Sequence, residues 1–118
     1  MKTVTIVLAF FLSTIFLQAQ SQVQSGSFNF NSSVTGYTLD KNMGERTTSI
    51  EITFEKPLDK KPKIVLSTTM IDAETKSNLR YRIEAYSISR DGFMLKVTTW
   101  GDTKIFGLSG NWIAHTEN

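Results

Sequence analysis

The sequence predicts an all-β domain, built from six short strands as an antiparallel sandwich or small barrel. Apolar and polar residues alternate with a period of two in several stretches, which is typical of strands with one buried face. No stretch after residue 20 has the period of a helix, and turn-forming residues recur at intervals of roughly 8 to 12 residues. A chain of 118 residues has room for one such domain.

Residues 1–20 have the pattern of an export signal and are predicted to lie outside the fold. A lysine at the second position is followed by the mostly apolar run Val4–Leu17 and then by a polar stretch. We expect cleavage near Ala19 or Gln20, which leaves residues 21–118 as a secreted domain. The apolar run is shorter than the about 20 residues that cross a membrane. No membrane span is therefore expected in the mature form, and a retained anchor is the minor alternative.

The mature chain is nearly neutral, because removing the signal takes away one lysine and lowers the net charge from +2 to +1. Such a charge gives no basic surface for nucleic acid, and no nucleic-acid partner is expected. Lys60, Lys61 and Lys63 surround Pro62 and are interpreted as a solvated turn. The chain has no cysteine, so its core must hold the fold alone or with the help of subunit contacts.

The first half of the mature chain contains two predicted strands separated by a long loop. Two phenylalanines alternate with polar residues in Ser27–Phe30, which predicts a short strand. Residues 34–46 contain glycines and polar residues without a sustained period, so we expect a loop there. Thr48–Phe54 then alternates cleanly, with two isoleucines and a phenylalanine on one face and polar residues on the other.

Four strands are predicted in the second half. Lys63–Met70 is rich in β-branched residues, Leu79–Ser89 is the longest predicted strand, and Phe93–Thr99 alternates with Phe, Leu and Val on one face. Asp91-Gly92 predicts a hairpin turn with positive φ, which would pair the second of these strands with the third. Leu108–His115 is the last predicted strand.

Residue types that perform catalysis are scarce. His115 is the single histidine and lies near the C-terminus, and there is no cysteine, so neither a histidine triad nor an ordinary zinc site has its ligands. The carboxylates do not have the spacing of a calcium loop, and there is no glycine-rich phosphate loop. We expect no enzyme, no metal and no cofactor. A small glycosidase built on two carboxylates is the remote alternative.

Trp100 is the leading candidate for a binding residue. A period of two places it on the polar face of its strand, after Lys96, where the ring can form a platform for the apolar face of a sugar. Arg80 on the neighbouring strand can supply hydrogen bonds on the same face. Two alternatives stay open from the residues alone: a loop or subunit can cover Trp100, and Arg80 can form a surface salt bridge with Glu84 or another neighbour.

Several short motifs follow one another through Asn78–Ala114. They are an N-x-R start, a polar turn before Gly-Phe, a T-W pair followed by D-T, and a closing N-W-I-A strand. The residues concerned are Asn78 and Arg80, Ser89 to Phe93, Thr99 and Trp100, Asp102 and Thr103, and Asn111 to Ala114. In these motifs the chain resembles the H-type lectin domain, which is also found at the end of discoidins. Weaker similarity extends upstream over nearly the whole mature chain.

This resemblance implies a six-stranded antiparallel β-sandwich that assembles as a homotrimer, or as a homohexamer of two trimers. It also implies non-catalytic binding of glycans with terminal N-acetylgalactosamine (GalNAc) or galactose, at sites where protomers meet. By position, Arg80 and Trp100 match the sugar-contacting arginine and tryptophan of the family. Gly101 stands where the family often has histidine, and Phe106 stands where it has tyrosine, so a hydrogen-bonding group is missing at both positions.

The family also uses a glycine and an aspartate from the loop before the second strand. Within residues 34–46, Gly44 with Glu45 and Asp40 with Asn42 are both candidate pairs. The resulting hypothesis is a secreted, metal-independent lectin of the kind that serves cell adhesion. The alternative is a structural or protein-binding oligomerisation module with a degenerate sugar site.

Overall fold

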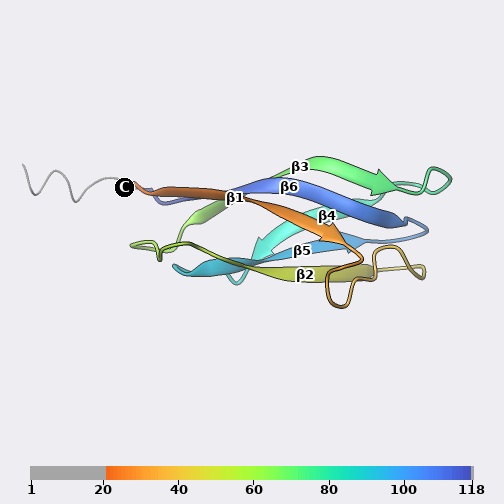
Figure 1. The fold of residues 1–118 in the computed structure, drawn as a ribbon, viewed down its shortest axis with the longest axis horizontal. Coiled ribbons are helices and arrows are strands. Elements are labelled where there is room, and N and C mark those ends of the chain that lie inside the picture. The colour runs from red at the N-terminus through yellow and green to blue at the C-terminus, as the bar shows by residue number, and fades with distance from the viewer. Residues whose placement is uncertain (1–20, 118) are drawn as a thin grey trace, which may run out of the picture.

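The computed structural model describes residues 21–117 as two facing three-stranded sheets (Figure 1). The strands are β1 (Val23–Asn31), β2 (Arg46–Thr53), β3 (Lys63–Ala73), β4 (Tyr81–Tyr86), β5 (Gly92–Thr99) and β6 (Ile105–His115). All paired strands are antiparallel, which confirms the predicted six-stranded antiparallel β-sandwich. The expected export signal, residues 1–20, lies outside the described residues. No helix within residues 21–117 is long and apolar enough to cross a membrane.

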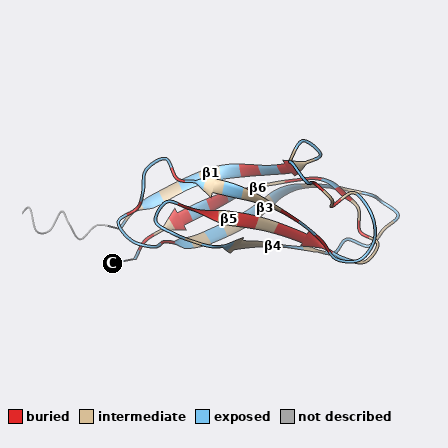
Figure 2. Ribbon diagram, turned by 90° about the horizontal axis from the view of Figure 1, so that it is seen from below, coloured by how far each residue is buried: buried red, intermediate tan, exposed pale blue. Residues whose placement is uncertain are grey.

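The strand order determines which elements carry the core. One sheet has the order β1-β6-β3 and the other the order β2-β5-β4, so β5 and β6 are the central strands. Both central strands carry long runs of buried residues (Figure 2). Phe93, Leu95 and Val97 of β5 are exposed by 3% or less, so the apolar face that the alternation predicted points into the sandwich.

Three aromatic rings join the two sheets at one end of the sandwich. Phe54 directly follows β2, Phe93 lies in β5, and Trp112 lies in β6 of the opposite sheet. Their ring centroids are 5.6 to 6.0 Å apart in tilted and edge-on arrangements. Burying a phenylalanine side chain contributes about 1.5 to 3 kcal/mol, and aromatic contacts of this geometry add to it. This cluster therefore stabilises the packing of one sheet on the other.

Four strands differ in length from the prediction by three residues or more. β3 extends to Ala73, beyond the predicted end at Met70. β1 begins at Val23, earlier than expected, and β6 begins at Ile105. β4 has only 6 residues, although Leu79–Ser89 was predicted as the longest strand. Ser87 explains the early end of β4, because its φ of 51° lies in the left-handed region, where an extended strand cannot continue.

The turn between β4 and β5 also differs from the prediction. Positive φ was expected at Asp91-Gly92, but the residue with positive φ in this connection is Ser87. Gly92 is needed for a different reason. A Cβ at this position would lie 2.1 Å from the backbone oxygen of Ile52 on β2. The glycine thus permits the close approach of β2 and β5 at the start of their pairing.

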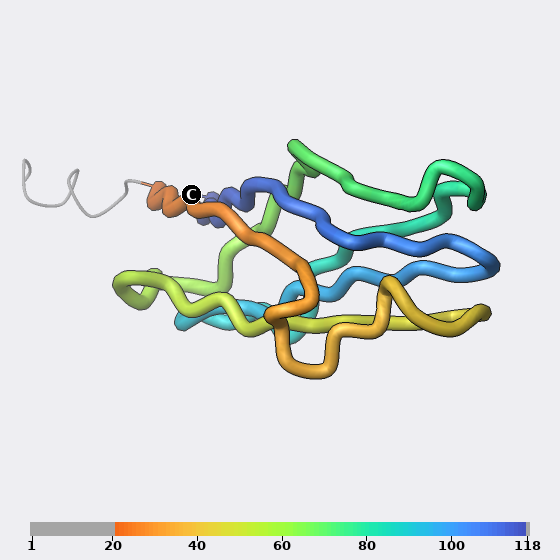
Figure 3. Tube along the Cα trace, turned by 45° about the vertical axis from the view of Figure 1, so that its right-hand side comes forward, coloured from red at the N-terminus to blue at the C-terminus, as the bar shows by residue number. Residues whose placement is uncertain are grey.

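The two ends of the described chain lie side by side (Figure 3). Val23 at the start of β1 pairs with His115 at the end of β6. Two hydrogen bonds extend this pairing, from Gln22 N to Thr116 Oγ1 at 2.8 Å and from Thr116 N to Gln22 O at 3.0 Å. Both ends therefore leave the sandwich at the end that carries Trp112.

Candidate functional site

The pairing of β4 with β5 places Arg80 opposite Trp100. Tyr81 pairs with Thr99 at the ends of these strands, and Arg80 and Trp100 are the next residues outward. The hydroxyl of Thr99 donates to the backbone oxygen of Arg80 at 2.5 Å. The backbone of Arg80 is thereby held against the end of β5, one residue beyond the last pair of β4 and β5.

Thr103 fixes the same backbone from the other side. Its hydroxyl is fully buried, accepts a hydrogen bond from the backbone N–H of Arg80 at 3.0 Å, and donates to the backbone oxygen of Asn78. A buried hydroxyl that satisfies both a donor and an acceptor holds the two segments in one geometry. This gives a structural role to the Asp102-Thr103 pair that follows Trp100.

The side chain of Arg80 is half-exposed and pairs with Asp102. Nη1 of Arg80 lies 3.3 Å from Oδ1 of Asp102, and the two side chains are 42% and 41% exposed. A surface pair of this kind contributes little to stability. Glu84, the partner considered for Arg80 from the sequence, instead binds Arg82, with 2.6 Å between Nε and Oε1. Arg80 does form a surface salt bridge, but with a different carboxylate.

Trp100 is 37% exposed, so no loop of the protomer covers it completely. The guanidinium carbon of Arg82 lies 5.6 Å from the centroid of the Trp100 ring, within the range of a cation–π interaction. Arg82 is itself held by Glu84. The ring is therefore accessible, and one of its neighbours is a guanidinium group that sequence reasoning missed.

Gly101 has a φ of +68°, a conformation that strongly favours glycine. A Cβ at this position would lie 3.3 Å from Nη1 of Arg80 and 3.8 Å from its Cδ. The missing side chain therefore leaves the guanidinium group of Arg80 uncovered. Gly101 thus permits the positive φ of this turn and leaves the side chain of Arg80 accessible.

The loop between β1 and β2 is attached to the turn at Gly101 by Arg46. Arg46 is 6% exposed and donates from Nε to Gly44 O at 3.0 Å, from Nη1 to Lys41 O at 2.8 Å and from Nη2 to Gly101 O at 3.1 Å. The backbone N–H of Gly44 also donates to Gly101 O at 3.0 Å. This part of the loop thus borders the candidate site. The clearest signal in the sequence would have been an arginine at the start of a strand whose single other charged residue is Glu51.

Of the two candidate pairs in this loop, Gly44 with Glu45 lies closer to Gly101, because the backbone N–H of Gly44 donates directly to Gly101 O. Asn42 is also attached, since its backbone oxygen accepts a hydrogen bond from Lys104. The Oδ1 atom of Asp40 is buried and has no hydrogen-bond partner within the described residues. One carboxylate oxygen of Asp40 is therefore shielded from solvent, while the residue as a whole is partly exposed.

Tyr37 is the buried group beside Asp40. Its hydroxyl donates to the backbone oxygen of Ile105 at 2.6 Å. Burial, together with the negative charges of Asp40 and Asp72, raises the pKa of Tyr37 to about 12. The tyrosine therefore stays neutral at physiological pH and anchors the loop to the start of β6.

Phe106 is not brought to the other candidate residues by a hydrogen bond or ring contact within the described residues. It lies on β6, in the sheet β1-β6-β3, where the register with β3 shifts between Asp72 and Ala73, and it is 48% exposed. Arg80, Trp100 and Gly101 instead lie at the end of the sheet β2-β5-β4. The structure thus gathers three of the four predicted residues and leaves Phe106 on the other sheet.

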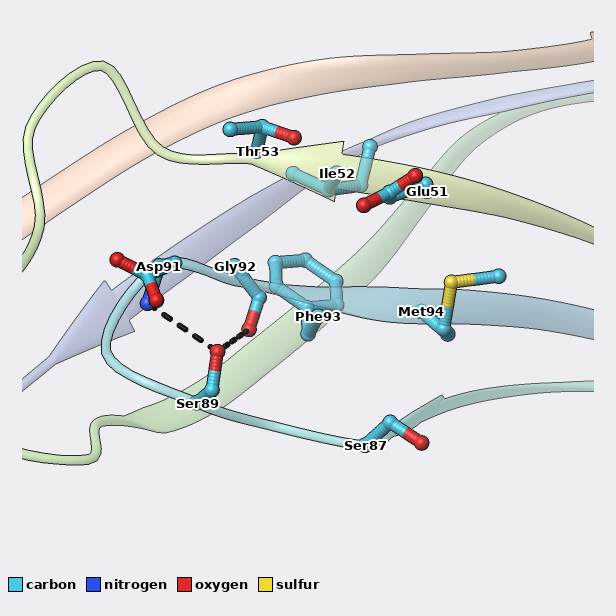
Figure 4. A pocket seen from close by; sticks show the side chains of 9 residues that line it. All are labelled: Glu51, Ile52, Thr53, Ser87, Ser89, Asp91, Gly92, Phe93 and Met94. Carbon is cyan, nitrogen blue, oxygen red and sulfur yellow. Dashed lines mark hydrogen bonds between the residues drawn. The ribbon is translucent and has the colours of Figure 1, made fainter.

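A cavity of about 270 Å³ lies at the opposite end of β5 (Figure 4). Five residues of β5 separate its lining from Trp100, which corresponds to roughly 20 Å. Ser89 closes one side, with its hydroxyl accepting from Asp91 N at 3.2 Å. None of the predicted site residues is in its lining, which consists of Glu51, Ile52, Thr53, Ser87, Ser89, Asp91, Gly92, Phe93 and Met94. The candidate site is therefore a surface platform and not this hollow.

The single histidine and the carboxylates form no metal-binding cluster in the part of the chain that the structure describes. His115 lies at the terminal end of the sandwich, paired with Val23 and Lys63, away from Trp100. No group of three or more histidine, cysteine, aspartate or glutamate residues within residues 21–117 is placed to hold a metal ion. The exposed aromatic and the two guanidinium groups are suited to binding.

Comparison with known proteins gives one family and several relatives. The model of the H-type lectin domain matches residues 49–115. A Fuscovulum blasticum protein named ATP synthase subunits region ORF 7 is 34% identical over 71 residues, which are 60% of this chain and 62% of that protein.

The solved structures give the same fold. Two structures of discoidin II from Dictyostelium discoideum have TM-scores of 0.75 and 0.74 at 23% identity, over 85% of this chain and 38% of theirs. A Pseudomonas phage tailspike has a TM-score of 0.51 at 12% identity, over 82% of this chain and 16% of that one. The chain therefore spans less than two thirds of each of these relatives.

Proposed function

The chain belongs to the H-type lectin domain family, and from this premise we propose that it is a secreted, metal-independent lectin for terminal GalNAc or galactose-type sugars. Membership of the family supports a carbohydrate-binding function. The sugar class comes from the family resemblance of Arg80 and Trp100. Secretion is proposed from the export-signal pattern of residues 1–20.

One observation carries the proposal: Arg80 and Trp100 lie together and accessible at the end of a rigid sheet. The tryptophan offers a flat apolar surface, and the arginine offers several N–H donors in a fixed plane. Sugars present apolar C–H faces beside hydroxyl groups, so this pairing matches both parts of the ligand. Hydrogen bonds from Thr99 and Thr103 hold the backbone of Arg80 in place.

We further propose that the lectin assembles as a homotrimer or homohexamer through the sheet β1-β6-β3. Val65 and Ile113 are register partners on this sheet and are 51% and 43% exposed. Val23, at the edge of the same sheet, is 66% exposed. Neighbouring exposed apolar residues often mark a protein interface. An assembly through this sheet would also allow the exposed side chain of Phe106 to contact the sugar site of a neighbouring protomer.

A glycan array with variants tests the proposal. The protein should bind glycans with terminal GalNAc or galactose in a saturable manner. Arg80→Ala should weaken binding by about tenfold or more, since a hydrogen bond from a charged group contributes about 1.5 to 3 kcal/mol. Trp100→Ala should also weaken binding, because it removes the apolar surface on which the sugar stacks. Lys60→Ala, which removes an exposed charge elsewhere, should bind normally. Circular dichroism and native mass measurement check that every variant folds and assembles.

The second candidate function is a structural or protein-binding oligomerisation module. The separation of Phe106 from Trp100 and the absence of a side chain at Gly101 favour it, because both weaken the sugar site. In that case a folded oligomer would bind no glycan, and Trp100→Ala and Arg80→Ala would leave partner binding intact. That pair of results would exclude the lectin proposal.

A further inference from the structure

Two guanidinium groups flank Trp100, and each has donors to spare. Arg80 uses one atom, Nη1, for Asp102 at 3.3 Å, and Arg82 uses Nε for Glu84 at 2.6 Å. An arginine carries five N–H donors. Neither ion pair is buried, because all four side chains are between 41% and 51% exposed. Both arginines can therefore bind a further acceptor without breaking their existing pairs.

Space for such an acceptor exists over Arg80. Gly101 leaves Nη1 and Cδ of Arg80 without a covering side chain, at 3.3 and 3.8 Å from where a Cβ would be. The guanidinium carbon of Arg82 lies over the Trp100 ring, 5.6 Å from its centroid, and covers part of one face. A substituent on a sugar that stacks on the remaining surface of Trp100 can thus reach the donors of both arginines.

Basic and acidic side chains are nearly balanced around this end of the sheet. Lys96 on β5 lies opposite Glu84, with its Nζ 5.2 Å from the centroid of Tyr86. The basic residues of the surrounding elements are Lys41, Arg46, Lys76, Arg80, Arg82, Lys96 and Lys104, and the acidic ones are Asp40, Glu45, Asp72, Glu74, Glu84 and Asp102. Arg46 is buried, so the net charge of the surface does not by itself select an anion. The selection comes from the exposed donors of Arg80 and Arg82.

Resting on the proposed lectin function, we infer that the site selects saccharides that carry an anionic substituent, a carboxylate or a sulfate. The apolar face of the sugar stacks on Trp100. The anionic group lies in the space left by Gly101 and accepts hydrogen bonds from Arg80 and Arg82. Guanidinium groups bind carboxylates and similar oxyanions through two parallel hydrogen bonds, which makes arginine better suited than lysine to this role.

Isothermal titration calorimetry with three probes tests this inference: galactose, galactose 6-sulfate and galacturonic acid. At low ionic strength at least one anionic probe should bind about tenfold more tightly than galactose, as expected for charge-assisted hydrogen bonds. Raising the salt concentration should reduce this preference, because exposed charges are screened. The two anionic probes distinguish sulfate from carboxylate recognition.

Arg82→Gln provides the residue-level test. It should bring the ratio of anionic to neutral affinity close to one, whereas Lys60→Gln, which removes the same charge far from the site, should leave that ratio unchanged. Equal or weaker binding of both anionic probes, with galactose still bound, would overturn the inference and leave the lectin proposal standing. If the folded oligomer binds none of the three probes or any arrayed glycan, both proposals are wrong.

Discussion

Replacing Arg46 with alanine should lower the free energy of unfolding by about 2 to 4 kcal/mol. Its guanidinium group donates to three backbone oxygens, those of Gly44, Lys41 and Gly101, at 2.8 to 3.1 Å. A hydrogen bond from a charged group contributes about 1.5 to 3 kcal/mol. The accepting carbonyls lie in surface segments, so water replaces part of the loss and the total stays below the sum of three bonds.

Urea denaturation followed by tryptophan fluorescence measures this change, and hydrogen exchange at the Gly44 amide reports on the loop. Gly44 N–H donates to Gly101 O at 3.0 Å, so its protection should fall in Arg46→Ala. Arg90→Ala is the matched control. Arg90 donates from Nε to a single backbone oxygen, that of Leu58, at 2.7 Å, and its loss should cost about 1 to 2 kcal/mol.

Arg46→Lys keeps the positive charge at this position but removes the planar set of N–H donors. A lysine ammonium group cannot reproduce the planar arrangement that spans three carbonyls, so this variant should lose most of the same stability. Two results would refute the reasoning: Arg46→Ala costing no more than Arg90→Ala, or unchanged protection of Gly44. Either would mean that the loop is held by other contacts.

Two further predictions concern Tyr37 and Gly92. Burial raises the pKa of Tyr37 from the usual 10.0 to about 12 in the folded protein. As the pH rises, the tyrosine therefore loses its proton in the unfolded chain before it does so in the folded one. The free energy of unfolding should fall by about 2 to 3 kcal/mol between pH 10 and pH 12. Tyr37→Phe should flatten that part of the stability profile, and an unchanged slope would contradict the assignment. Gly92→Ala should cost about 3 kcal/mol in thermal unfolding, because its Cβ would meet Ile52 O at 2.1 Å. Gly36→Ala, with positive φ but open space, should cost only about 1 to 2 kcal/mol, and equal losses would show that the contact is not decisive.

The alternation of apolar residues was sufficient to predict the sandwich. Phe93, Leu95 and Val97 follow a period of two without interruption, and burial of that face is a local consequence of strand geometry. The bounds of β4 were not predictable in the same way. Ser87 adopts positive φ although serine has no strong preference for it, so this conformation is imposed by the packing of the connection.

The candidate site was only partly predictable for a related reason. Arg80 and Trp100 could be placed together because one hairpin pairs their strands. Arg46 could not, since its three acceptors come from a loop and from a turn that lies 55 residues away. Phe106 was grouped with the site from family position alone, whereas contact between residues of different sheets depends on tertiary or quaternary packing.

The pairing of β1 with β6 has a practical consequence for how this domain can be displayed. Because both ends of the described chain leave near Trp112, a tag or tether joined at residue 21 or residue 117 attaches at the end of the sandwich away from Trp100. Protein captured through such a tag on a sensor or bead would point its Arg80 and Trp100 surface outward. The strand order thus determines how the tethered protein is oriented, and the immobilised protein should bind as much ligand per molecule as it does in solution.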